Sequence, residues 1–264
     1  MLTVTNLHKT FNPCTVNEKR VLNGIDLHLN KGDFTTVIGG NGAGKSTLLN
    51  MIAGVHFSDK GSLQLDNEDI TFIPEYERAK YLGRVFQDPM MGTAANMQID
   101  ENLAMSYRRG KRRGLRWGIT KAEKSLYYDK LKILDLGLET RLSTKVGLLS
   151  GGQRQALTLL MATLKEPKLL LLDEHTAALD PKTAEKVLDI TDQIVKKSSL
   201  TTLMITHNMK NAIQYGNRLV MMYDGQIIFD VSGKEKEELE INDLLEKFKV
   251  ASDGDFSNDR MLLS

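Results

Sequence analysis

The sequence predicts an α/β fold with a mainly parallel sheet, an N-terminal antiparallel β subdomain and an inserted α-helical subdomain. Short apolar runs alternate with helical patterns, which is typical of parallel strands covered by helices. The first ~30 residues alternate apolar with polar side chains, as half-exposed antiparallel strands do. Residues 101–163 are mostly helical in pattern and lack clear strands, which favours a helical insertion.

Four buried strands are predicted from the apolar runs, at residues 34–39, 168–173, 201–206 and 218–223. Helices are predicted from about residue 45, with Leu48, Leu49, Ile52 and Ala53 on one face, and at residues 181–197 and 208–215. After Gly233 the chain is rich in charge, and KEKEELEINDLLEKF predicts one short amphipathic helix before a frayed end. We therefore expect one large domain at residues 1–235 and a short helix and tail at residues 236–264.

Composition and charge give no support for a nucleic-acid-binding, disulfide-bonded, secreted or membrane-spanning protein. The formal net charge of the 264 residues is +1, so no global attraction to nucleic acid is implied. The single cysteine, Cys14, excludes an internal disulfide and fits a cytosolic setting. The N-terminus has no signal-peptide pattern, and no apolar run approaches the ~20 residues that span a bilayer.

A phosphate-binding loop is predicted where the first core strand meets its helix. GGNGAGKS fits G-x-x-x-x-G-K-[ST], and the following Thr47 extends it. Its glycines let backbone N–H groups converge on phosphate oxygens, and the helix N-terminus adds positive potential. The binding residues are Gly39, Gly40, Asn41, Gly42, Ala43, Gly44, Lys45, Ser46 and Thr47. Lys45 would reach the β- and γ-phosphates of ATP, and Ser46 would ligate Mg²⁺. The alternative is a glycine-rich turn with a chance lysine.

Two acidic residues end a second buried strand, in LLLLDE. Asp173 would hold Mg²⁺ through water, and Glu174, pointing differently, would polarise an attacking water. The alternative is an acidic pair that only caps a loop.

A second glycine-rich turn lies in LLSGGQ, where Ser150 and Gln153 form the S-x-x-Q pattern of a capping box. Gly151 and Gly152 place no side chain at the first helical turn, so a ligand could approach the backbone there. By itself the pattern equally fits a plain helix cap.

In their order along the chain, GGNGAGKST, LSGGQ and LLLLDE resemble the ATP-binding cassette (ABC) ATPases, up to about residue 235. The resemblance implies a P-loop NTPase core in which two copies dimerise head to tail. Each ATP would then lie between the phosphate loop of one copy and the signature helix, with residues Ser150, Gly151, Gly152 and Gln153, of the other.

Further site residues follow from the resemblance. Gln87 in VFQDP matches the glutamine loop, which touches Mg²⁺ and water and faces the transmembrane partner. Asp180 in AALD matches the loop that crosses the dimer interface, and His207 in MITHN matches the switch histidine at the γ-phosphate. Phe11 matches the aromatic residue that stacks on adenine, although the family more often has tyrosine there and Phe11 could be core. The loop at residues 12–20 is expected to form a hairpin near the nucleotide.

Two features depart from the family pattern. His175 follows the catalytic acid where the family has proline or alanine; it could tune Glu174, contact the dimer interface, or be a tolerated loop residue. Residues 107–121, with Trp117 at the centre, hold seven basic side chains and no acid. They form either a solvated face or a contact with anionic lipid headgroups.

The resemblance implies the ATPase subunit of a transporter, with ATP and Mg²⁺ as cofactors, peripheral at the cytoplasmic face of the membrane. Its expected partners are a second copy, separate permease subunits and, through these, an extracytoplasmic substrate-binding protein, but no nucleic acid. Import is favoured because the permease is not fused, and MMGTAANMQIDENLAM resembles bacterial cassettes for aromatic amino-acid uptake. The alternatives are a lipid or drug exporter, or a cassette ATPase acting on nucleic acid or ribosomes.

Overall fold

The computed structural model describes residues 1–110 and 118–252, so Trp117 and four of the seven basic side chains of residues 107–121 lie outside the described residues. The chain divides into two compact units, one formed by Met1–Arg78 with the chain from Ser199 onward, the other by Ala79–Ser198. Within the described ranges, no helix has the length and apolar character needed to cross a membrane.

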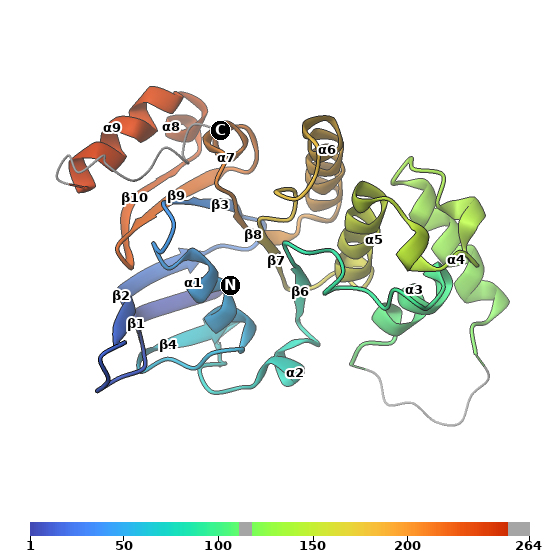
Figure 1. Cartoon of the computed structure of the whole chain (residues 1–264), viewed down its shortest axis with the longest axis horizontal. Helices are drawn as coiled ribbons and strands as arrows, with labels where there is room; N and C mark the ends of the chain where they lie inside the picture. The colour runs from blue at the N-terminus through green and yellow to red at the C-terminus, as the bar shows by residue number, and fades with distance from the viewer. Residues whose placement is uncertain (111–117, 253–264) are drawn as a thin grey trace. The chain divides into compact units, whose positions relative to one another are not determined.

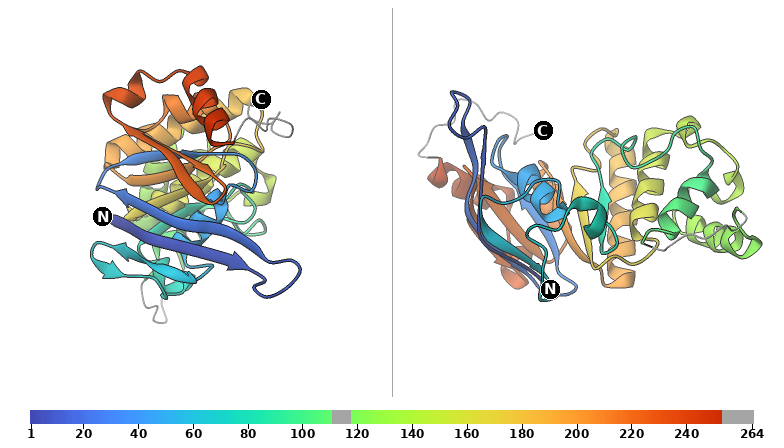
Figure 2. Two further views of the ribbon diagram at one scale, coloured as in Figure 1. Left: turned by 90° about the vertical axis from the view of Figure 1, so that its left-hand side faces the viewer. Right: turned by 90° about the horizontal axis from the view of Figure 1, so that it is seen from below.

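The first unit contains the predicted antiparallel sheet, drawn in blue and cyan in Figures 1 and 2. Its strand order is β2-β1-β4-β5. Because one face is buried, apolar residues such as Leu2 and Val4 alternate with exposed ones. The bounds are β1 Leu2–Phe11, β2 Lys19–Leu29, β4 Lys60–Leu65 and β5 Glu68–Asp69.

The same unit holds core strands in the order β10-β9-β3-β8. β3 pairs in parallel with both β8 and β9, and β10 is antiparallel to β9. Every residue of β3 and β8 is buried, as expected for central strands of a parallel sheet that is covered on both faces. The bounds are β3 Phe34–Ile38, β8 Thr201–Ile205, β9 Arg218–Tyr223 and β10 Gln226–Ser232, so the three predicted strands of this unit are confirmed.

The helices of the first unit are α1 Lys45–Ala53, α2 Glu75–Arg78, α7 Met209–Gln214, α8 Lys234–Glu237 and α9 Ile241–Ala251. One expectation is wrong: the charged tail forms two helices rather than one. Glu240 interrupts them because it caps α9, its backbone N–H donating to Asp243 at 2.8 Å. In Figure 1, α7 and α9 lie on the same side of β9 and β10.

The second unit holds the parallel pair of β6 Leu82–Val85 and β7 Leu169–Asp173. Its helices are α3 Ile99–Tyr107, α4 Lys121–Lys132, α5 Gly151–Thr163 and α6 Pro181–Ser198, with short 3₁₀ turns η1 Glu139–Arg141 and η2 Val146–Leu148. Among the described residues between 101 and 163 the structure has helices and turns and no named strand, as expected for the insertion. The predicted α/β class with an antiparallel N-terminal sheet is thus confirmed.

Candidate nucleotide site

The phosphate loop leaves β3 and turns sharply into α1. Gly44 has φ +96°, in the left-handed region that favours glycine, and a Cβ there would overlap with the carbonyl oxygen of Val21. The loop is also held by the turn between β9 and β10, since the Gly225 N–H donates to the Ala43 carbonyl at 3.2 Å. The glycines therefore serve both the tight turn and close backbone packing.

The first turn of α1 is built to receive an anion. Its N-cap is Gly44, and no side chain of this described loop caps it. Intrahelical bonding begins when the Leu48 N–H donates to the Gly44 carbonyl at 2.8 Å. The preceding N–H groups and the helix dipole thus present positive potential toward the loop.

Lys45 and Ser46 are the first two residues of this helix and differ in exposure. Lys45 is 7% exposed, and its Nζ donates to the carbonyls of Gly39 at 2.7 Å and Gly40 at 3.0 Å. The ammonium is therefore held within the curve of the loop, where a phosphate would meet it. Ser46 is exposed, so its hydroxyl is accessible to a metal ion.

Phe11 ends β1 immediately before the predicted hairpin loop. Its ring packs edge-on against His56, with centroids 5.2 Å apart, and the Lys9 ammonium lies 5.7 Å from its centroid. The side chain is partly exposed, so it is not enclosed in the core. The described geometry suits a stacking surface, and adenine stacking stays a prediction.

His207 lies between the end of β8 and the start of α7. The next residue, Asn208, is the N-cap of α7, and its side chain accepts the Asn211 N–H at 3.0 Å. Asn208 also donates its own N–H to the Thr206 hydroxyl at 3.1 Å. Hydrogen bonds on both sides of His207 thus fix its backbone.

In the second unit, Asp173 and Glu174 follow one another at the end of β7. Arg84, on the neighbouring strand β6, places its guanidinium 3.8 Å from the Asp173 carboxylate. Glu174 has φ +43°, an unusual backbone angle for a non-glycine residue. The roles of Asp173 as a metal ligand and of Glu174 as a base stay predictions.

His175 is not a tolerated loop residue. It is 2% exposed, and its Nε2 lies 3.1 Å from the Thr191 hydroxyl on α6. Since that hydroxyl donates to the Val187 carbonyl at 2.8 Å, Nε2 must carry the proton that joins the two side chains. Burial lowers the pKa of His175 to about 4, so the ring is neutral. His175 therefore anchors the turn that carries Glu174.

The glutamine loop follows β6, and Gln87 is exposed there. Gln155 from α5 is fully buried and donates its amide N–H to the Phe86 carbonyl at 3.2 Å. Phe86 immediately precedes Gln87, so this bond sets where the loop begins. The apolar pattern around Gln155 gave no sign of this role.

The signature turn has the predicted capping box. The Ser150 hydroxyl accepts the Gln153 N–H at 3.3 Å, and the Gln153 side chain accepts the Ser150 N–H at 3.2 Å. Arg154 braces the preceding turn by donating to the carbonyls of Gly147 at 3.2 Å and Leu149 at 3.1 Å. Arg154 was not among the predicted site residues, since its partners are carbonyls of the preceding turn and no motif marks it.

The two glycines of this turn, Gly151 and Gly152, have different surroundings. Gly152 is buried, and a Cβ there would overlap with the Thr183 methyl group of α6. Its missing side chain therefore allows α5 to pack closely against α6, and ligand approach to the backbone of this turn stays a prediction. Gly151 is exposed, and a Cβ there would meet the Leu179 side chain at 3.3 Å.

Asp180 begins α6. Its carboxylate accepts the Thr183 N–H at 3.1 Å, and these bonds to Thr183 lower its pKa below the usual range. Pro181 occupies the first helical position, where its missing N–H costs nothing. Asp180 is thus a helix cap, and its predicted place at a dimer interface stays a prediction.

The predicted residues divide between the two units. The first unit holds Phe11, the phosphate loop and His207. The second holds Gln87, Ser150–Gln153, Asp173, Glu174 and Asp180. Among the described residues no group of three or more His, Cys, Asp or Glu side chains could form a metal cage.

Comparison with known proteins identifies the family. Residues 22–177 match the family model described as ABC transporter. The chain is 44% identical over 251 residues to the tyrosine transport ATP-binding protein of Clostridioides difficile (strain R20291), covering 95% of this chain and 100% of the relative. It is 35% identical over 217 residues to the spermidine/putrescine import ATP-binding protein PotA of Escherichia coli (strain K12), covering 82% of this chain and 54% of the relative.

Solved structures agree. The ADP conformation of MJ1267, an ATP-binding cassette of an ABC transporter, gives a TM-score of 0.77 at 30% identity and covers 96% of this chain and 97% of its own. The dimeric post-hydrolysis state of the cassette MJ0796, bound to ADP and phosphate, gives a TM-score of 0.74 at 26% identity. The match covers 88% of this chain and 98% of that structure's chain. The chain therefore belongs to the ABC transporter family and is an ATPase of that family, binding ATP and coupling its hydrolysis to transport.

Proposed function

We propose that the chain is the ATPase subunit of an importer for an aromatic amino acid, with tyrosine as the first candidate. The observation that carries the substrate is the 44% identity to a tyrosine transport ATP-binding protein over the whole of that relative. Import is supported by the match to a spermidine/putrescine import subunit, although this chain spans only 54% of that protein. Both resemblances favour an importer over a lipid or drug exporter.

The proposed chemistry is phosphoryl transfer from ATP to water. Lys45, held within the phosphate loop, would neutralise charge on the β- and γ-phosphates. Glu174, which follows β7 with φ +43°, would orient and polarise the attacking water. His207 would contact the γ-phosphate from the loop that Thr206 and Asn208 fix.

Ser46, Gln87 and Asp173 would hold Mg²⁺, which supplies charge neutralisation at the phosphates when bound. The fit rests on the chemistry of these side chains, which are all oxygen donors. Ser46 and Gln87 are exposed, and Asp173 is partly so. Gln155 would keep Gln87 in place through the Phe86 carbonyl.

The site would be completed by a second copy of the chain. The solved relative MJ0796 is dimeric. By analogy, the capped turn at Ser150–Gln153 would bind the γ-phosphate of the nucleotide held by the partner, and Asp180 would lie at the interface. The N-terminus of a helix of thirteen residues with an exposed Gly151 suits this role. Phe11 would stack on adenine.

The dimer would dock on separate permease subunits at the cytoplasmic face of the membrane, with an extracytoplasmic binding protein delivering the substrate. No contact with nucleic acid is proposed. The cassette would not touch the cargo, so the substrate assignment rests on the relatives rather than on the site.

Uptake in cells of the source organism tests the proposal. Deleting this chain should abolish uptake of radiolabelled tyrosine and leave spermidine uptake unchanged, and the wild-type gene should restore it. Glu174→Gln should restore no uptake, because loss of the base lowers ATP turnover by about 10²–10⁴-fold. Glu185→Gln is the matched control, since Glu185 is exposed on α6 and the change is the same. Unchanged tyrosine uptake in the deletion would refute the substrate.

A purified complex tests the direction of transport. Glu174→Gln should retain ATP and the closed dimer, so a tagged copy is purified from membranes in mild detergent and its partners are identified. A multi-span permease with a substrate-binding protein supports import. A permease without one, exporting lipid in vesicles, would support the exporter alternative.

A further inference from the structure

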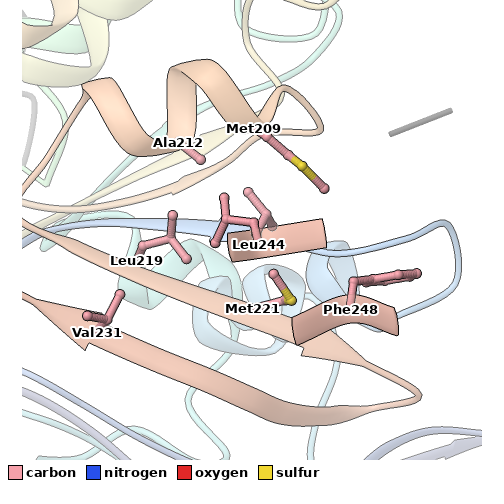
Figure 3. Packing of buried hydrophobic residues seen from close by; sticks show 8 residues of the cluster. Met209, Ala212, Leu219, Met221, Val231, Leu244 and Phe248 are labelled. Carbon is pink, nitrogen blue, oxygen red and sulfur yellow. The ribbon is translucent and has the colours of Figure 1, made fainter. Parts of the chain in front are cut away.

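The C-terminal helices pack directly on the element that carries His207. Met209 and Ala212 of α7 are buried in one cluster with Leu244 and Phe248 of α9. Figure 3 shows these side chains gathered between α7, α9 and the strands. The cluster also contains Ile38, the residue immediately before the phosphate loop. The chain beyond β10 is therefore part of the core beneath the nucleotide loops.

A buried lysine fixes the other end of α7. Lys236, on α8, is 2% exposed. Its ammonium donates to the carbonyl of Tyr215, the C-cap of α7, and to that of Gly216 at 2.9 Å. Carbonyls at a helix C-terminus lack intrahelical partners and carry negative potential, so a cation is favourable there.

The charge of Lys236 is satisfied by backbone groups. Among the described residues the structure pairs no carboxylate with it, and its hydrogen-bond acceptors are backbone carbonyls. Burial lowers its pKa to about 8, which shows how far the ammonium is removed from water. Charged side chains are seldom buried without such specific partners.

The lysine is itself held in place. The Gly233 N–H, at the start of α8, donates to the Asn217 carbonyl at 3.0 Å, and the Lys236 N–H donates to Gly233 at 3.0 Å. In the middle of α7, the Thr36 hydroxyl of β3 donates to the Ala212 carbonyl at 2.9 Å. With the Asn208 cap at its start, α7 is fixed at its beginning, middle and end.

We propose that Lys236 is a positioning residue for His207: by clamping the C-terminal end of α7, it fixes the short helix whose N-cap immediately follows the histidine. α7 has only six residues, so a displacement of one end is transmitted to the other. The inference rests on the proposed role of His207 at the γ-phosphate. It makes α8 and α9 part of the catalytic apparatus rather than an appended tail.

Steady-state ATPase kinetics of the full chain test this inference. Lys236→Met should lower kcat about tenfold through a small misplacement of His207 and leave the KM for ATP within about twofold. Lys234→Met is the matched control, because Lys234 lies exposed on the same helix, and it should change neither constant. Full activity of Lys236→Met would overturn the inference.

A double-mutant cycle separates positioning from general stabilisation. In the His207→Ala background, read by single-turnover hydrolysis of labelled ATP, Lys236→Met should change the rate by less than about twofold, because its target is gone. An equal tenfold loss in both backgrounds would show a structural role only and overturn the inference. If Lys236→Met does not fold, Lys236→Gln, which keeps an N–H donor, replaces it in the same cycle.

The cycle also distinguishes the two levels of proposal. Full activity of His207→Ala alone would refute the role assigned to His207. If His207→Ala is impaired and Lys236→Met is fully active, only the positioning role of Lys236 is refuted.

Discussion

Acidification should weaken the second unit through His175. The ring is 2% exposed and neutral, with its pKa lowered from 6.5 to about 4 by burial. In the unfolded chain the same ring takes up a proton near pH 6.5. Protons therefore bind the unfolded state more strongly, so the contribution of His175 to stability is complete above pH 6.5 and is lost as the pH falls from 6.5 to 4.

The magnitude follows from the two pKa values. Between pH 7.5 and pH 5 this residue should lower the free energy of unfolding by about 2 kcal/mol. His175→Leu removes the titration while keeping similar volume. At pH 7.5 the variant should be less stable by about 1 kcal/mol, because it loses the hydrogen bond to Thr191. The Thr191 hydroxyl keeps its bond to Val187, so no polar group is orphaned.

Urea unfolding followed by circular dichroism at pH 7.5 and pH 5 provides the assay. The loss of stability between the two pH values should be about 2 kcal/mol smaller in His175→Leu than in the wild type. His28→Gln is the control, since His28 is exposed on β2, and it should retain the wild-type loss. An equal loss in wild type and His175→Leu would refute the assignment of a buried, neutral ring.

Three other substitutions test local features. Gly152→Ala should destabilise the chain by about 1–3 kcal/mol through overlap with the Thr183 methyl group, and adding Thr183→Ser should recover much of this in thermal melts. Arg78→Met should cost about 3 kcal/mol in urea unfolding, because it removes a buried guanidinium that donates to the carbonyls of Met51 and Ile52, at the end of α1. Phe11→Ala should raise the KM for ATP about tenfold, whereas Phe11→Tyr should not, if the ring stacks on adenine; equal KM values would place Phe11 in a structural role.

Local sequence rules predicted much of the site. The phosphate loop, the capping box at Ser150 and the strand at residues 218–223 all lie where the pattern placed them. Each depends on residues within one turn or one strand, so the information is contiguous in the chain. The strands β4, β5, β6 and β10 were not predicted. β6 is only four residues long and β10 carries a charged residue, Asp230, that pairs with Arg218 on β9.

The sequence by itself thus determined the fold class, the family motifs and the caps that open the functional helices. Only the tertiary structure shows that the side chains of His175, Lys236 and Arg78 are buried, because a sequence pattern would place these polar residues in solvent. The hydrogen bonds from His175 to Thr191, from Lys236 to Gly216 and from Arg78 to Met51 join residues that are 16 to 27 positions apart along the chain. Whether a polar side chain is buried depends on which distant carbonyls and hydroxyls can replace its water, and only the packed elements supply those groups.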